Sequence, residues 1–325
     1  MARIILCPGQ GAQVVGMGKA WFDASPEARA VFAEADGVLM GRLPGGQKLS
    51  ELCFGGPAEV LNRTDVSQPA IYTTTIACWR GLLARWGCAS AEDAGVAATA
   101  GLSLGEYSAL QIAGVFTFQE GLNLVALRGR AMQEAAEGTP SGMIALIGAD
   151  ESQAESVCAQ TLAAHPGEVL VPANFNAPGQ IVLSGSKVAV GAAEGVAVGM
   201  GLRGTVLQVA GAFHSPIMRP AADRLATALA QTPMQAPTCP VMSNVTAQPH
   251  GGQGGGGGGA LEETIRGRLV EQLMAPVRWS GCCEWLVGAF GGAEVVELAP
   301  GRTLAGLMRR INKGVKVQGF DEPGA

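Results

Sequence analysis

The 325-residue sequence predicts an α/β protein in which a smaller subdomain is inserted into a larger one that contains a parallel sheet. Apolar runs typical of strands alternate with amphipathic helical stretches through residues 1–138, which indicates a parallel α/β sheet. The order of elements changes from Gly142, and a strand typical of a sheet core returns at Val295–Leu298. We therefore expect the large subdomain to comprise residues 1–138 and 211–325, and the small one residues 139–210.

A glycine-rich turn at Pro8–Gln13 follows the first expected strand, Arg3–Cys7. It differs from a dinucleotide-binding motif because Val14 occupies the position of the third glycine in G-x-G-x-x-G. A turn after this strand would lie at the carboxyl edge of a parallel sheet, where ligands bind. The backbone N–H of Gln10 could therefore stabilise an oxyanion, although a turn needed only for chain reversal would have the same sequence.

A serine stands in a tight turn between a second expected strand, Val96–Ala100, and a helix expected at Tyr107–Ala113. Such a turn requires small residues two positions to either side of the serine, and Gly101 and Gly105 meet this requirement. The turn would present the Ser103 hydroxyl above the sheet, beside helix N-terminal N–H groups that can stabilise an oxyanion. We interpret Ser103 as a nucleophile for acyl transfer in an α/β-hydrolase-like subdomain, the alternative being an ordinary glycine-rich turn.

An arginine lies on the apolar face of the helix expected from about residue 120 to 136. The neighbours of Arg128 three and four positions away include Leu124, Val125 and Met132. A buried arginine needs a partner, because burying an unpaired charge is costly. That partner is either a buried carboxylate of the protein or a substrate carboxylate, whose geometry matches the planar guanidinium.

The smaller subdomain is expected to be ferredoxin-like, because its elements follow the order β-α-β-β-α-β over residues 139–210. Strands are expected at Met143–Ile147, Val169–Pro172, Gln180–Ser184 and Thr205–Ala210, and helices at Asp150–Ala164 and Lys187–Met200. The glycine run at 251–259, in the large subdomain, is expected to form a flexible surface loop.

A serine nucleophile normally requires a base, and the chain has three histidines. His165 and His250 lie in stretches expected to be exposed loops, whereas His214 lies among small and apolar residues. His214 is therefore the candidate base for Ser103. No Asp or Glu stands near it in sequence, so its second partner must come from elsewhere or be a backbone carbonyl or an amide side chain.

Composition excludes several other classes of function. The net charge of −5 argues against nucleic acid as the main partner, and no apolar run approaches the ~20 residues that span a bilayer. The eight cysteines contain no C-x-x-C pair, which fits packing roles in a reducing compartment and no zinc site. No phosphate-binding G-x-x-x-x-G-K-[ST] motif occurs.

Together these segments resemble the malonyl-CoA:acyl carrier protein transacylase family over nearly the whole chain. The matching stretches are Pro8–Gln13, Gly101–Ala109, Leu127–Glu134, Asn174–Gln180, Phe213-His214, Ser243–Val245, Gln272, Pro276–Trp279 and Glu297–Gly301. Their order, and the placing of Arg128 twenty-five residues after Ser103, make the set specific.

The resemblance implies ping-pong acyl transfer without a metal or a tightly held cofactor. The family's nucleophile falls on Ser103, its base on His214 and its malonate-binding arginine on Arg128. Ser103 would take malonyl from malonyl-CoA as an ester and pass it to the phosphopantetheine thiol of acyl carrier protein. The other positions carried over are the oxyanion amides Gln10 and Leu104, the histidine-orienting Gln272, and the substrate-site residues Phe213, Met132 and Asn174.

Two positions refine the resemblance. Phe213 is similar to the malonyl-selective form of related polyketide acyltransferases, in which the ring crowds the space that a methylmalonyl branch requires. Leu102 stands where bacterial members usually carry histidine, so the chain looks more like the plastid forms of plants and algae. We therefore expect a monomer in the chloroplast stroma with its transit peptide already removed, or otherwise in the cytoplasm.

Two other functions stay open at this point. A serine hydrolase or thioesterase of the α/β-hydrolase type would have Asp or Glu as the third catalytic member and would hydrolyse its ester readily. A non-catalytic acyl-carrier-binding protein would not need Ser103, His214 and Arg128 together.

Overall fold

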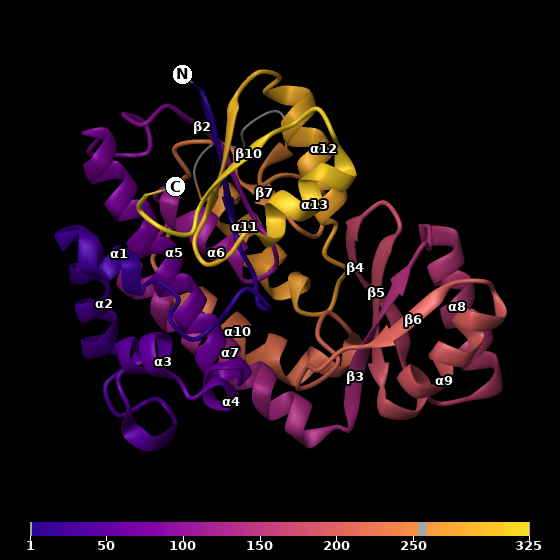
Figure 1. Ribbon diagram of the computed structural model, residues 1–325. Helices are drawn as coiled ribbons and strands as arrows, with labels where there is room; N and C mark the ends of the chain where they lie inside the picture. Colours follow the sequence, from indigo (N-terminus) through magenta and orange to yellow (C-terminus); the bar gives the residue numbers. More distant parts are fainter. Residues whose placement is uncertain (1, 253–258, 325) are drawn as a thin grey trace.

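The computed structural model describes residues 2–252 and 259–324, and its two main sheets lie in separate parts of the molecule (Figure 1). The larger part is built on a parallel sheet of order β10-β9-β1-β2. Its strands are β1 (Arg3–Cys7), β2 (Val96–Gly101), β9 (Glu294–Leu298) and β10 (Val317–Phe320). The predicted mixed α/β fold is confirmed, while residues 253–258 of the predicted glycine-rich loop lie outside the described residues.

Helices surround this parallel sheet. Those before the small subdomain are α1 (Lys19–Ala24), α2 (Pro26–Val38), α3 (Leu49–Gly55), α4 (Ala58–Leu61), α5 (Thr64–Trp86), α6 (Gly105–Ile112) and α7 (Phe118–Gly138). Those after it are α10 (Arg219–Gln231), α11 (Ala260–Gln272), α12 (Trp279–Ala289) and α13 (Thr303–Ile311). Short 3-10 turns occur at Pro44–Gly46 and Pro216–Met218, and a small hairpin pairs β7 (Met242–Ser243) with β8 (Gln248–Pro249).

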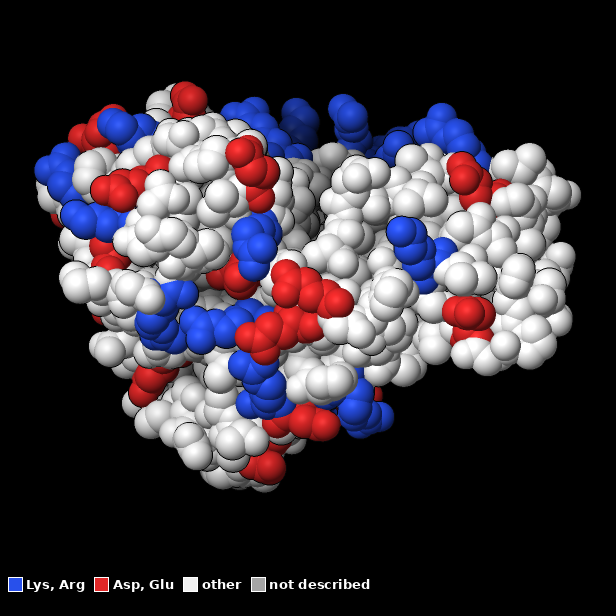
Figure 2. All heavy atoms as spheres, turned by 90° about the horizontal axis from the view of Figure 1, so that it is seen from below, with Lys and Arg blue, Asp and Glu red and all other residues white. Residues whose placement is uncertain are grey.

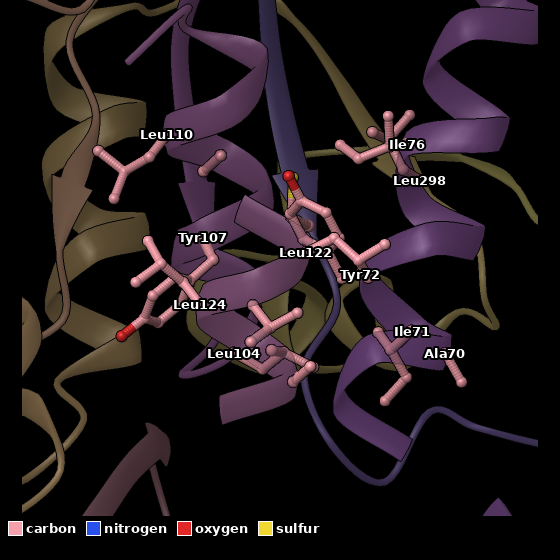
Figure 3. Close-up of a cluster of buried hydrophobic side chains, with 14 of the residues drawn as sticks. Ala70, Ile71, Tyr72, Ile76, Leu104, Tyr107, Leu110, Leu122, Leu124 and Leu298 are labelled. Atoms are coloured by element: carbon pink, nitrogen blue, oxygen red, sulfur yellow. The ribbon is translucent and has the colours of Figure 1, made fainter. Parts of the chain in front are cut away.

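The two faces of the parallel sheet bury different helices because side chains alternate along each strand. Ile5 and Cys7 of β1 join the core formed with α2, α5, α6 and α7, whereas Ile4 and Leu6 join the core formed with α12 and α13. Figure 3 shows part of the first core, where Tyr107 from α6 lies near Leu124 from α7. Helices on both faces bury most residues of β1, β2 and β9, as expected of a parallel sheet.

The smaller part is an antiparallel sheet of order β4-β5-β3-β6, with the chain order predicted for a ferredoxin-like unit. Its elements are β3 (Ser141–Ile147), α8 (Glu151–Ala164), β4 (Leu170–Ala177), β5 (Gln180–Ser186), α9 (Lys187–Gly199) and β6 (Arg203–Val206). Two predicted boundaries are wrong. Strand β4 continues beyond Pro172 because it pairs with β5 as far as Ala177, and β6 ends at Val206, where its pairing with β3 ends.

One face of the small sheet is covered by α8 and α9, and the other faces the large part (Figure 1). Because side chains alternate along a strand, neighbouring residues face opposite sides of the sheet. Ile144, Phe175 and Ile181 pack against the helices, whereas Met143 and Asn174 line a cavity on the opposite face. The two parts are also joined through the backbone, because Phe175 N–H donates to Val277 O at 2.9 Å.

The surface and the cysteines agree with the composition. Acidic and basic side chains lie next to one another on the face shown in Figure 2. Within the described residues no helix has the length and apolar character needed to cross a membrane. All eight cysteines are free, and burial raises the pKa of those in the core, such as Cys7 and Cys282, which matches a packing role.

Candidate active site

Ser103 lies in the tight turn that joins β2 to α6, and the turn has the geometry that its glycines predicted. The backbone φ of Ser103 is 53°, in the left-handed region that non-glycine residues rarely adopt. A Cβ atom at Gly101 would overlap the backbone of Gly105, and one at Gly105 would overlap the carbonyl oxygen of Cys7. The Ser103 N–H donates to Oδ1 of Asn244 at 2.6 Å, which fixes the turn from outside.

His214 is the base candidate that the structure brings to Ser103. Its Nε2 lies 2.8 Å from Ser103 Oγ, and its Nδ1 lies 2.7 Å from the backbone carbonyl oxygen of Gln272. Because a carbonyl only accepts, Nδ1 carries the hydrogen and Nε2 is left to accept the serine proton. The predicted alternative of a backbone carbonyl as second partner is therefore confirmed.

Burial, and to a smaller extent the nearby positive charge of Arg128, lower the pKa of His214 from 6.5 to about 4. The hydrogen bond to Gln272 opposes this shift. The imidazole is therefore neutral at neutral pH, which is the form required to accept a proton.

Arg128 extends from α7 to the same point, and only 1% of its surface is exposed. Its Nη1 donates to Gln68 Oε1 at 2.7 Å, and its Nη2 donates to Ser103 Oγ at 3.1 Å and Gln272 Oε1 at 3.0 Å. These partners are all uncharged, so the predicted alternative of a buried ion pair is wrong for the described part of the chain. The guanidinium also stacks over the Tyr107 ring at 5.5 Å.

A cavity of about 430 Å³ opens onto these three side chains. It lies between the two parts of the molecule, because residues of the small sheet and of the large part both line it. Of the predicted site residues, it is lined by Gln10, Ser103, Arg128, Met132, Asn174, Phe213 and His214. Met132, Phe213 and Asn174 are buried in its wall, so the site can enclose a small acyl group.

The predicted oxyanion donors lie at the two turns beside Ser103. The backbone N–H groups of Gln10 and Leu104 have no acceptor within residues 2–252 and 259–324. Leu104 directly precedes α6, and Gln10 follows β1, which pairs with β2. Gln10 lines the cavity and Leu104 adjoins Ser103, so these two N–H groups can stabilise negative charge that develops beside the serine.

Comparison with known proteins agrees with this geometry. Residues 4–313 match the family described as acyl transferase domain. The malonyl CoA-acyl carrier protein transacylase of Escherichia coli (strain K12) is 38% identical over 319 residues, which are 98% of this chain and 95% of that protein. The chain belongs to this transacylase family.

Solved structures of the family superpose on the whole chain. The acyl-carrier-protein S-malonyltransferase of Bartonella henselae has a TM-score of 0.88 and 37% identity, and the match covers 100% of this chain and 96% of that one. A malonyl-transacylase solved in complex with a type II polyketide acyl-carrier protein has a TM-score of 0.88 and 35% identity, over 100% and 97% of the two chains.

In this member of the transacylase family, three residues to which the sequence assigned no role contact site residues, and a fourth, His250, contacts one of those three. Gln68 Oε1 accepts a hydrogen bond from Arg128, and Asn244 Oδ1 accepts one from the Ser103 N–H. Glu106 and His250 form a buried pair at 2.8 Å behind the turn, so the prediction that His250 is exposed is wrong. One signal was available in the sequence, because Glu106 is the one charged residue of α6.

Within the described residues, no group of three or more His, Cys, Asp or Glu side chains is arranged to hold a metal ion. Leu102, which directly precedes the serine, lines the cavity. Its backbone carbonyl accepts from Gly105 N–H at 3.0 Å, so it also helps to close the turn.

Proposed function

We propose that this chain transfers malonyl from malonyl-CoA to the phosphopantetheine thiol of acyl carrier protein, supplying fatty acid synthesis. The observation that carries the proposal is that a nucleophile, a neutral base and a buried arginine meet at one serine hydroxyl, and that the arginine has no carboxylate partner in the described part of the chain. Ser103 Oγ lies 2.8 Å from His214 Nε2 and 3.1 Å from Arg128 Nη2. An arginine without a carboxylate partner suits an acyl group that brings its own carboxylate.

In the first half-reaction, Ser103 loses its proton to Nε2 of His214 as its oxygen attacks the thioester carbonyl. The amides of Gln10 and Leu104 stabilise the oxyanion, and Nδ1–H of His214 stays bonded to Gln272 O, which supports the imidazolium that forms. The C–S bond then breaks, and the coenzyme A thiolate takes the proton from His214. A malonyl-serine ester remains.

In the second half-reaction, the carrier thiol gives its proton to His214 and its sulfur attacks the ester. The bond to Ser103 Oγ breaks, and the proton returns from His214 to the serine. Arg128 holds the free carboxylate through both halves, and Met132 and Asn174 line the acyl site. The Phe213 ring lines the same cavity, and we expect it to crowd the branch of a methylmalonyl group.

Incubation with malonyl-CoA and the holo form of acyl carrier protein tests this function. We expect malonyl-carrier to form, with little free malonate when the carrier is left out. Release of malonate at the same rate without carrier would indicate a hydrolase, and no release of coenzyme A at all would indicate a non-catalytic carrier-binding protein.

The assembly and location of the chain stay predictions. We propose a monomer, because its cavity is complete within one chain. Light scattering coupled to size exclusion would test this. We propose that the protein is located in the chloroplast stroma, or otherwise in the cytoplasm. Immunolocalisation of the endogenous protein would decide between the two compartments.

A further inference from the structure

A fully buried carboxylate lies directly behind the nucleophile turn and takes no part in the steps above. Glu106 is the second residue of α6 and has no exposed surface. Its Oε2 accepts from the backbone N–H of Asn244 at 3.0 Å and from Nε2 of Gln272 at 2.7 Å, and its Oε1 lies 2.8 Å from Nε2 of His250. These three hydrogen bonds connect the buried carboxylate to Asn244, Gln272 and His250 in one network. Each hydrogen bond offsets part of the free-energy cost of burying the charge.

The first branch of this network fixes the nucleophile through Asn244. Because Glu106 holds the Asn244 backbone, the amide side chain of Asn244 is placed against the turn. Its Oδ1 accepts from Ser103 N–H at 2.6 Å, and its Nδ2 donates to Gly101 O at 2.8 Å. Asn244 therefore supports the serine while it holds the left-handed backbone conformation.

The second branch fixes the base and the arginine through Gln272. Its Nε2 donates both to Glu106 and to Ser103 O, at 2.7 and 3.0 Å, its Oε1 accepts from Arg128, and its backbone carbonyl accepts from His214 Nδ1–H. A carboxylate only accepts, so Glu106 forces the Nε2 end of this amide toward itself. The Oε1 end is thereby aimed at Arg128, and the reverse orientation would set two donors against each other.

His250 completes the network on the far side of the carboxylate. Its side chain is fully buried and contacts the one carboxylate oxygen that neither amide branch uses. The backbone N–H of His250 donates to Val241 O at 2.9 Å, which anchors the residue at the end of the β7–β8 hairpin. The position of the His250 imidazole is therefore fixed, and its hydrogen bond can orient the Glu106 carboxylate.

We propose that Glu106, held by His250, is a positioning residue for acyl transfer: it sets Asn244 and Gln272, and through them the alignment of Ser103, His214 and Arg128. This inference rests on the proposed function. It predicts that losing the carboxylate slows serine acylation in a protein that is still folded. Both malonyl and acetyl loading are affected, because the serine and the histidine serve both.

The test compares Glu106→Gln with Glu297→Gln. Glu297 is also fully buried, and its carboxylate accepts from the N–H groups of Leu304 and Ala305 rather than contacting Ser103, His214 or Arg128. We expect Glu106→Gln to lower the first-order acylation rate at saturating malonyl-CoA and acetyl-CoA at least tenfold, while the control stays near wild type. Acylation of folded Glu106→Gln at the wild-type rate would overturn the proposal.

Two variants of His250 keep the test decisive if Glu106→Gln does not fold. Glutamine places an N–H donor near the position of His Nε2, and leucine removes it. His250→Leu is expected to slow acylation, and His250→Gln to restore most of the rate; wild-type rates in both would contradict the proposal. Failure of the wild-type protein itself to load malonyl would instead reject the proposed function.

Discussion

Ser103 and His214 both hold left-handed backbone conformations, with φ of 53° and 60°. Such strain persists only where surrounding contacts fix it. For the serine these contacts come from Asn244, and for the histidine ring from the carbonyl of Gln272. The contacts cross more than fifty residues of sequence, so the reactive geometry belongs to the folded chain and not to the local motif.

Arg128→Ala tests the carboxylate-binding role at this scale. Losing a buried charged contact to the malonyl carboxylate is expected to reduce kcat/KM for malonyl-CoA by about 10²-fold or more. Acetyl-CoA has no such carboxylate, so its kcat/KM should change by roughly tenfold or less. The matched control is Arg130→Ala, an exposed arginine on the same helix.

Loading assays with the two thioesters measure the difference between them. Equal losses for malonyl-CoA and acetyl-CoA in Arg128→Ala would mean that the arginine only supports the fold of the site. A comparable loss in Arg130→Ala would show that the effect is not specific to the buried guanidinium.

The pH dependence of loading tests the state of His214. Burial disfavours the imidazolium, so the neutral base is present above a pKa of about 4 and is lost as the pH falls through that value. We expect kcat/KM for malonyl loading to stay nearly constant from about pH 7.5 to 5.5 and to halve near pH 4. A half-loss near pH 6.5, the ordinary value for histidine, would contradict the account.

Residues that carry chemistry are predictable from the sequence, whereas of the residues that hold them only Gln272 is, and that through the family resemblance. Ser103 was identified by its flanking glycines and His214 by the scarcity of histidine. His250 was placed in an exposed loop because it adjoins the glycine run, yet its side chain is buried against Glu106. The burial of His250 depends on packing against elements that are distant in sequence, and the residues next to it in the sequence do not predict that packing.

At the scale of elements, the strand-turn-helix unit of β2 and α6 depends on close backbone contact. Gly105→Ala would drive a Cβ into the carbonyl oxygen of Cys7, and we expect a loss of about 3 kcal/mol or more in the free energy of unfolding. Gly267→Ala is the matched control, because Gly267 lies exposed in α11 with open space around its Cβ position.

Urea unfolding measures both variants. Alanine inside an exposed helix should stabilise Gly267→Ala by about 0.5–1 kcal/mol. A Gly105→Ala protein as stable as wild type would show that the turn can relax, and would contradict the reason given for its glycines.

Element boundaries were predicted less well than element order. The sequence predicted the β-α-β-β-α-β order, but it ended the second strand of the small sheet near Pro172. Strand β4 continues to Ala177 because β5 pairs along it and Val277 of the large part bonds to its edge. Pairing partners far along the chain decide where a strand ends.

At the scale of the whole molecule, the cavity exists because the inner face of the small sheet lies opposite the nucleophile turn. Its lining includes residues of β3, β4 and β5 from the small sheet, and residues of α7, α13 and the turns after β1 and β2 from the large part, so both parts form its wall. The boundary of the small subdomain at residues 139–210 remains a prediction. Its own apolar core, from Ile144 to Ala197, supports it.

Expression of residues 139–210 alone tests that boundary. Because this core lies entirely within the segment, a chain of roughly 70 residues should unfold cooperatively on heating, with lower stability than the intact protein. Circular dichroism would follow the transition. A gradual, non-cooperative change would show that the small sheet folds only with the large part.

The most direct test of the account is intact-protein mass spectrometry after brief mixing with malonyl-CoA, on wild type and Ser103→Ala in parallel. The account predicts a malonyl adduct on the wild-type protein alone, which acyl carrier protein then removes faster than water does. A malonyl adduct on Ser103→Ala, or no adduct on a folded wild-type protein, would contradict it.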